Sequence, residues 1–232
     1  MHDAVIVCVG DELLTGDTTD IHGAYLARYL TDRGIRVRGV RLVGDSAEDI
    51  ASLVEVIAGS AELAVLTGGL GPTSDDLTRD ALALVTGEPL EFDGELWALI
   101  QRTVGRPLGG SNRRQAYRPS GFVALANPQG TAPGLLGAIG SCRVAALPGP
   151  PHELRGMIEK HCEVILNGLS QLRPPEHLLS CFGVAESAVE DTLSRGRADG
   201  AFDSELTWHT RAGGGRIVVA LRNGTAAGFA TV

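Results

Sequence analysis

The chain has 232 residues, of which 44% are hydrophobic, enough to bury one substantial core beside a smaller second unit. Its formal net charge of -8 argues against a nucleic-acid surface, because such surfaces normally carry an excess of Lys and Arg. The four cysteines lack zinc-site spacing, and the apolar run near the N-terminus is too short for a signal peptide or a membrane span. We therefore expect a cytoplasmic protein without nucleic-acid or membrane partners.

The first part of the chain alternates between strand and helix patterns. Short apolar runs are typical of strands, and apolar residues three or four positions apart are typical of helices. The run at residues 63–67 is apolar throughout, as expected in a parallel sheet that is covered on both faces. The predicted elements are strands at 4–9, 35–43 and 63–67, each followed by a helix: residues 21–30, a helix that starts at Ser46, and a helix that ends near Gly87.

This alternation predicts an α/β fold with a doubly wound, mostly parallel sheet, because right-handed crossovers place helices on both faces. In such sheets, ligands bind beyond the carboxyl ends of the strands. Three segments reach that edge: Gly10 to Gly16, Gly44-Asp45, and Thr67 to Asp76. The sequence therefore predicts a ligand site where these segments meet.

Two domains are predicted, residues 1–170 and residues 171–232, with QLRPPE at 171–176 as the linker. Before the linker, a helix at 93–104 and the polar turn GGSNRRQA precede short strands at 122–125, 135–139 and 142–147, and LPGPPHEL opens a helix to about residue 169. After it, a strand at 178–184, a helix at 186–193 and two strands joined near 213–215 predict a small α+β domain.

The segment LTGGLGPTSDDLTRD, residues 66–80, carries the strongest local signal for chemistry. Its glycines allow the main chain to approach an anion closely, and the helix that follows directs free N–H groups toward that anion. Its hydroxyl side chains add further donors. The candidate substrate contacts here are Gly68, Gly69, Gly71, Thr73, Ser74 and Thr78.

Acidic residues stand beside these glycines. Asp75 and Asp76 would repel a bare phosphate, so they indicate a hard cation between carboxylate and phosphate. Asp45 and Glu12 reach the same edge of the sheet, although a turn role stays open for each. Helix capping explains the acids but not the neighbouring glycines. We expect Asp45, Asp76 and Glu12 to bind Mg²⁺, Mn²⁺ or Co²⁺, with a monovalent cation as an additional candidate.

Further candidates lie in the loops. Gly10 is a candidate substrate contact because it ends the first strand. Arg113 and Arg114 could clamp a phosphate or form a solvated basic patch. Asn127 and Gly149 could contact a base or ribose, with turn roles as the alternative.

At these motifs the chain resembles the N-terminal part of the CinA family (competence/damage-inducible protein A), which is related to the molybdopterin-binding domains of molybdenum-cofactor biosynthesis. The long GGLGPT-x-DD-LT run is the specific part of the match. The matching pieces cover nearly the whole chain in order: residues 10–16 and 43–45, LTGGLGPTSDDLTRD, NRRQA, NPQGTAPG, LPGPPHEL, and FGVAESAVEDTL in a small KH-like domain.

The resemblance implies a metal-dependent nucleotide pyrophosphatase that hydrolyses ADP-ribose to AMP and ribose 5-phosphate, with FAD as a related substrate. It also implies that Asp45 and Asp76 lie at the cofactor or metal site and that the protein forms a homodimer. Full-length CinA proteins add a deamidase domain, whose activity we do not predict for these residues. Where many relatives have Asn-Thr-Asn or Asp-Thr-Asn, this chain has Asp20-Ile21-His22. The alternatives are a molybdopterin-binding module without hydrolysis and a regulatory nucleotide-binding domain.

Overall fold

The structure is a computed structural model that describes residues 2–104, 108–170, 177–202 and 206–222. It divides into two compact units, Met1–Gln171 and Leu172–Val232. The predicted boundary after residue 170 falls one residue before this division, and the predicted linker, 171–176, lies outside the described residues. Across the described ranges, no helix is long and apolar enough to cross a membrane.

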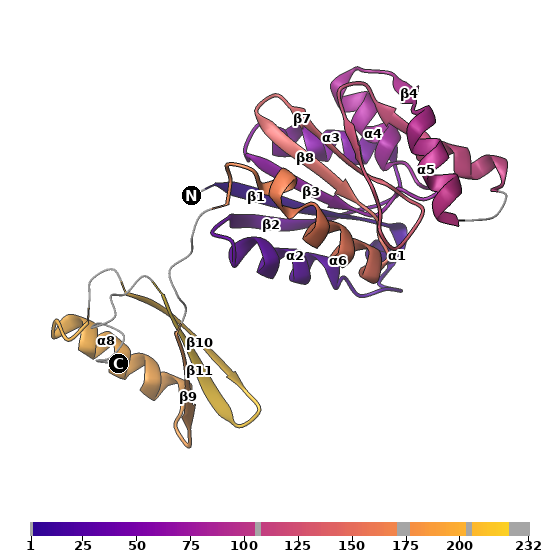
Figure 1. Cartoon of the computed structure of the whole chain (residues 1–232). Coiled ribbons are helices and arrows are strands. Elements are labelled where there is room, and N and C mark those ends of the chain that lie inside the picture. Colours follow the sequence, from indigo (N-terminus) through magenta and orange to yellow (C-terminus); the bar gives the residue numbers. More distant parts are fainter. Residues whose placement is uncertain (1, 105–107, 171–176, 203–205, 223–232) are drawn as a thin grey trace. The chain divides into compact units, whose positions relative to one another are not determined.

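A six-stranded sheet with the strand order β2-β1-β3-β8-β7-β6 forms the centre of the first unit (Figure 1). The first four strands in this order run parallel, whereas β7 is antiparallel to β8 and β6 is antiparallel to β7. This arrangement confirms the predicted α/β fold with a mostly parallel sheet. The strands are β1 (Asp3–Val9), β2 (Arg36–Val43), β3 (Leu63–Thr67), β6 (Val123–Leu125), β7 (Gly134–Ile139) and β8 (Cys142–Leu147).

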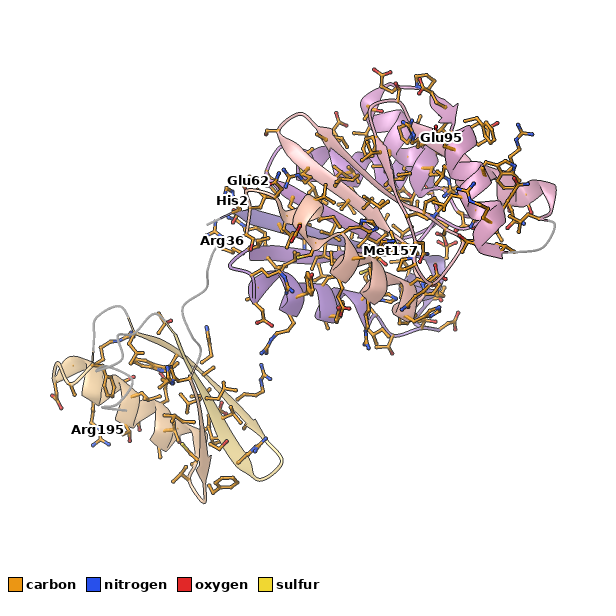
Figure 2. All side chains as sticks on the ribbon, in the orientation of Figure 1. His2, Arg36, Glu62, Glu95, Met157 and Arg195 are labelled. Atoms are coloured by element: carbon orange, nitrogen blue, oxygen red, sulfur yellow. The ribbon has the colours of Figure 1, made fainter. Side chains whose placement is uncertain are left out.

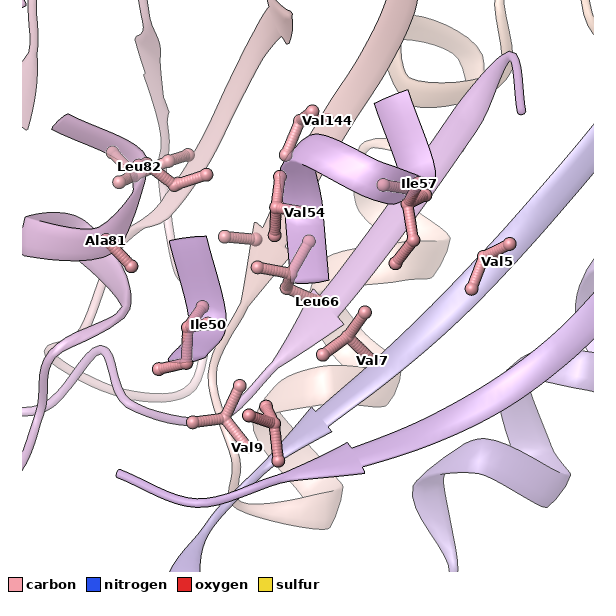
Figure 3. Close-up of a cluster of buried hydrophobic side chains, with 14 of the residues drawn as sticks. Val5, Val7, Val9, Ile50, Val54, Ile57, Leu66, Ala81, Leu82 and Val144 are labelled. Atoms are coloured by element: carbon pink, nitrogen blue, oxygen red, sulfur yellow. The ribbon is translucent and has the colours of Figure 1, made fainter. Parts of the chain in front are cut away.

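Helices cover both faces of the sheet because successive strand residues face opposite sides. The odd-numbered residues from Val5 to Val9 pack with α3 and α4 (Figure 3), and the even-numbered residues from Ala4 to Cys8 pack with α2, α6 and α7. Every residue of β3 is buried, which explains its unbroken apolar run. These helices are α2 (His22–Thr31), α3 (Ala47–Ala58), α4 (Thr78–Thr86), α6 (Pro151–Lys160) and α7 (Cys162–Leu166).

Some predictions about local structure were wrong. The single helix expected from LPGPPHEL to about residue 169 is two helices, because His161 leaves the helical conformation and its ring Nε2 lies 2.9 Å from the Ala126 carbonyl oxygen. The short helix α1 (Asp11–Thr15) was missed because none of its residues is buried, so it has no amphipathic pattern. Two short strands, β4 (Leu90–Phe92) and β5 (Tyr117–Pro119), were also missed; they pair into a two-stranded sheet. The predicted helix at 93–104 is α5 (Gly94–Val104), and the predicted polar turn contains a 3₁₀ helix at Gly110–Ala116.

The two ends of the main sheet differ in chemistry. At the amino ends of β1 and β2, Arg36 donates hydrogen bonds of 2.6 and 2.7 Å to Asp3. This pairing holds the pKa of Asp3 below its usual value. Figure 2 shows His2, Arg36 and Glu62 grouped at this end. Charges of opposite sign are therefore paired here, away from the carboxyl ends where the glycine-rich loop lies.

The second unit is a small α+β fold. Its sheet has the order β10-β11-β9 with antiparallel pairs, and Leu193 of α8 packs with Leu206, Ile217, Val219 and Leu221 in its core. This confirms the predicted small domain, although the helix runs five residues beyond the predicted end at residue 193. The elements are β9 (His177–Phe182), α8 (Glu186–Ala198), β10 (Thr207–Gly213) and β11 (Arg216–Arg222).

Candidate functional site

A cavity of about 590 Å³ opens at the carboxyl ends of the parallel strands. The segments that follow β1, β2, β3 and β8 line it, together with the loop before β7. Loops that are distant in sequence meet there because the carboxyl ends of parallel strands share one edge of the sheet. The predicted site residues that line the cavity are Gly10, Glu12, Asp45, Gly68, Gly69, Gly71, Asp76 and Gly149.

Six predicted site residues do not line this cavity: Arg113, Arg114, Thr73, Ser74, Thr78 and Asn127. The guanidinium of Arg113 lies 4.4 Å from the ring centre of Phe92. Arg114 forms a 3.0 Å ion pair with Asp80 and donates a 3.4 Å hydrogen bond to the Thr73 carbonyl. Arg114 thus contacts the main chain of the glycine-rich loop at Thr73, whereas Arg113 stacks on the Phe92 ring, and neither residue lines the cavity.

The loop after β3 turns sharply at two glycines. Gly68 has a φ of +104°, and a Cβ at this position would collide with the carbonyl oxygen of Val9. Gly69 has a φ of +67°, and a Cβ there would collide with the hydroxyl of Thr78. Only glycine meets both demands without strain, so the main chain can run along the cavity wall with no side chain in the way.

Asp76 shapes this loop. Its carboxylate accepts hydrogen bonds from the Gly71 N–H at 2.7 Å, the Thr73 N–H at 2.8 Å and the Thr73 hydroxyl. Asp76 also lines the cavity. The residue predicted as a cation ligand therefore holds the glycine-rich loop in its conformation.

A buried cation lies behind the same loop. Arg79 of α4 is 2% exposed and donates hydrogen bonds to the carbonyls of Leu70, at 2.7 Å, and Gly71. Burial lowers the pKa of Arg79 to about 10, so the guanidinium stays charged at neutral pH. Sequence reasoning missed this residue, although a basic side chain on the buried side of an amphipathic helix is a usable signal.

Four carboxylates interact where the segments after β1, β2 and β3 meet, which we call the acidic side: Asp11, Glu12, Asp45 and Asp75. Asp11 and Asp45 each accept a 3.0 Å hydrogen bond from the other residue's backbone N–H, so the two loops are tied together. Burial raises the pKa of Asp45, and the charges of the other three carboxylates raise it further. In the described parts of the chain, none of the four forms an ion pair with Lys or Arg.

These carboxylates match a hard divalent cation in donor type. Among the described residues, no group of three or more His, Cys, Asp or Glu side chains is placed to hold a metal ion. Mg²⁺, however, is commonly bound by one or two carboxylates while substrate phosphates and water complete its shell. Asp45 and Glu12 line the cavity beside the glycine-rich loop, so they fit a cation site that the ligand's phosphates would complete.

The opposite side of the cavity, which we call the amide side, contains Gln115, Asn127, Thr131 and Glu153. The Gln115 Nε2 donates a 3.2 Å hydrogen bond to the Thr131 hydroxyl oxygen. Asn127 does not line the cavity, but its Nδ2 donates a 2.6 Å hydrogen bond to Glu153. Sequence analysis did not single out Gln115, Thr131 or Glu153, although all three lie within the matched NRRQA, NPQGTAPG and LPGPPHEL motifs.

His22 also lines the cavity. Burial lowers the pKa of its imidazole, so the ring is neutral at pH 7. The Asp20 carboxylate accepts 2.9 Å hydrogen bonds from the N–H groups of His22 and Gly23, which caps the start of α2. The neutral imidazole of His22 is therefore a polar group in the cavity wall.

The chain is similar in sequence to a known protein family and to several curated proteins. Residues 5–167 match the family described as a probable molybdopterin binding domain. Relatives whose names read CinA-like or competence-damage inducible include one from Symbiobacterium thermophilum, 41% identical over 197 residues, and one from Frankia casuarinae, 38% identical over 203 residues. Both alignments cover 82% of this chain and 46% of the relative. The chain therefore spans about half the length of these curated relatives.

Solved structures of similar proteins have the same fold as this chain. The crystal structure of the CinA protein of unknown function from Thermoplasma acidophilum is 33% identical, with a TM-score of 0.68. The match covers 71% of this chain and 98% of that protein. A MoaB protein from a Thermus species, 22% identical with a TM-score of 0.50 over 73% of this chain and 94% of its own, shares the fold.

Proposed function

The chain belongs to the probable molybdopterin-binding domain family, in its CinA-like branch, and on that premise we propose that it is a metal-dependent nucleotide pyrophosphatase. The substrate we propose is ADP-ribose, hydrolysed to AMP and ribose 5-phosphate, with FAD as a second substrate. The observation that carries the proposal is the cavity itself, where an anion-binding glycine loop lies beside carboxylates that have no cationic partner among the described residues.

In this proposal, the backbone of Gly68, Gly69 and Gly71 binds the pyrophosphate. The N–H groups of Gly68 and Gly71 already donate to the Leu147 carbonyl and to Asp76, so the Gly69 N–H and the buried guanidinium of Arg79 behind the loop supply the attraction for negative charge. Asp76 keeps the loop in the shape that binding requires. The chain's own residues thereby hold the phosphates in place for attack by water.

Asp45 and Glu12 hold the divalent cation in this proposal, with Asp76 nearby in the same wall. A bound Mg²⁺, Mn²⁺ or Co²⁺ supplies polarisation of a phosphoryl oxygen and acidifies a water molecule. Arg114 supports the loop through the Thr73 carbonyl, so we assign it a positioning role. Arg113 receives no role in this proposal, because its guanidinium stacks on Phe92.

The test is the release of AMP from ADP-ribose or FAD by the purified protein in the presence of Mg²⁺, Mn²⁺ or Co²⁺, followed by chromatography. Asp45→Asn should lower the rate by roughly a hundredfold or more, because it removes a carboxylate that holds the divalent cation in this proposal. Asp17→Asn is the matched control, because Asp17 is an exposed carboxylate that accepts a hydrogen bond from Thr15 and does not line the cavity. The absence of AMP with every metal would refute the proposal.

A molybdopterin-binding module without hydrolysis is the second candidate, favoured by the family match over residues 5–167. Fold and glycine loop alone do not separate it from the first. Titration calorimetry with ADP-ribose and with a pterin phosphate would distinguish the two. We also propose a homodimer, which sedimentation of the purified protein tests.

A further inference from the structure

One polar atom in the cavity wall has no protein partner. Gln115 is 1% exposed, and its Nε2 donates to the Thr131 hydroxyl oxygen. Its Oε1 is buried and has no hydrogen-bond partner among the described residues. Buried polar atoms are almost always paired, so an unpaired acceptor on a residue that lines a cavity indicates a group that arrives from outside.

A second acceptor faces the same cavity. The Glu153 side chain is 14% exposed, and its Oε2 accepts the hydrogen bond from Asn127. Its Oε1 is 3.9 Å from a nitrogen of the exposed His152 ring, which is beyond an ordinary hydrogen bond. Asn127 also donates to the Ala132 carbonyl at 2.9 Å, so one loop positions both Glu153 and the Thr131 partner of Gln115. Two oxygen acceptors are thus fixed in the wall.

The strand order places these acceptors relative to the glycine loop. Along the sheet edge, the segments after β2 and β1 carry Asp45 and Glu12, the segment after β3 carries the glycines, and the segment after β8 carries Glu153. The loop before β7, which holds Thr131, lies beyond β8 in the same order. A ligand whose phosphates occupy the glycine loop therefore meets carboxylates on one side and the amide side on the other.

We propose that the amide side selects the ligand's heterocycle through an exocyclic amino group, which donates N–H hydrogen bonds to Gln115 Oε1 and Glu153. An amino group on a planar ring carries two N–H donors, which matches two acceptor oxygens, whereas a hydroxyl carries one. Adenine and a 2-aminopterin both have this chemistry. The assignment rests on the proposed function only for the position of the phosphates.

The experiment compares binding of ligand pairs that differ in this group, measured by calorimetry with the full chain and Mg²⁺. ADP is compared with IDP, and a 2-amino-4-oxopteridine with its 2,4-dioxo counterpart. In at least one pair, the wild type should bind the amino compound about tenfold more tightly, because the oxo analogue leaves buried acceptors unpaired. The pair that shows the preference identifies the adenine or the pterin source.

Gln115→Met should abolish the preference, because it keeps the length of the side chain and removes the acceptor. Gln129→Met is the matched control: Gln129 lies in the same loop as Thr131, does not line the cavity, and should leave the preference unchanged. The ligand-free melting temperature of Gln115→Met should change little, because the variant removes an unpaired buried oxygen together with the Nε2–Thr131 hydrogen bond, and these two losses have opposite effects on stability. Glu153→Gln, which keeps one acceptor, should reduce the preference and serves as the test if Gln115→Met does not fold.

Three results would overturn the inference: no preference in either pair, tighter binding of the oxo compounds, or a preference that survives Gln115→Met. The binding measurement is independent of turnover. A preference in a protein that releases no AMP supports the inference while the proposed hydrolysis fails. AMP release without any preference supports the hydrolysis and overturns the inference.

Discussion

The acidic side and the amide side of the cavity organise polar groups in different ways. On the acidic side, the Asp11 and Asp45 side chains bind each other's backbone N–H groups, and burial raises the pKa of Asp45, to which the charges of the neighbouring carboxylates add. On the amide side, Gln115 and Glu153 are each fixed by a neighbour, and Gln115 Oε1 has no hydrogen-bond partner among the described residues. In our two proposals, the first side binds a cation and the second accepts hydrogen bonds from the ligand's heterocycle.

The largest expected effect comes from the glycine loop, which lies between the two sides. Gly68→Ala would place a Cβ against the Val9 carbonyl at a positive φ. We expect a loss of stability of about 2 kcal/mol or more, from backbone strain plus the collision, and loss of nucleotide binding. Chemical denaturation and calorimetry measure both effects.

Gly94→Ala is the control for this substitution, because a Cβ at Gly94 meets no atom within 4 Å. It should be neutral or slightly stabilising at the start of α5. Equal effects of the two substitutions would contradict the role assigned to the loop.

Asp76→Ala should have the next largest effect. It removes the acceptor for the Gly71 and Thr73 N–H groups, so the loop should lose about 1–3 kcal/mol of stability as well as phosphate affinity. Asp75→Ala should change stability less, because Asp75 is exposed and the Gly71 and Thr73 N–H groups donate to Asp76. Thermal unfolding without ADP-ribose measures the loss of stability, and the additional stabilisation by ADP-ribose measures the loss of binding.

Asp45→Asn should stabilise the ligand-free protein at pH 7 by at most about 1 kcal/mol, because it removes repulsion among partly exposed carboxylates. Since folding raises the pKa of Asp45, its ionised form is less stable in the folded state. The advantage of the variant should be present above the raised pKa and disappear as pH falls toward the ordinary value of 3.8. Unfolding curves of both proteins from pH 7 to pH 3 measure the difference. A variant less stable than wild type at pH 7 would contradict this account.

Asp3→Asn should have the opposite sign and the smallest effect. Its pairing with Arg36 lowers the pKa of Asp3, so the ionised form stabilises the folded state. The wild type should be more stable than the variant at pH 7, and this difference should shrink as pH falls through the lowered pKa. The same pH series measures it. If Asp3→Asn and Asp45→Asn changed stability in the same direction, the contrast would be lost between the ion-paired amino ends of the strands and the acidic side, where no ion pair forms among the described residues.

Local patterns were sufficient to predict much of the fold and part of the site. The unbroken apolar run of β3 and the amphipathic helices predicted the layered sheet, and the positions of Gly10, Asp45 and Gly68 after strands predicted the edge where they meet. The role of Asp76 as a loop acceptor was not predicted. Its contacts depend on the folded path of the loop, which the residue types alone leave open.

The sequence by itself determined which strands are buried, which loops reach the ligand edge and where glycine is required, because these depend on periodicity and on neighbours along the chain. Tertiary structure alone decided which polar groups pair. Arg114 meets Asp80 across 34 positions, and Asn127 meets Glu153 across 26. Such partners are chosen by the packing of loops from different strands. The unpaired oxygen of Gln115 therefore became visible only in the folded chain.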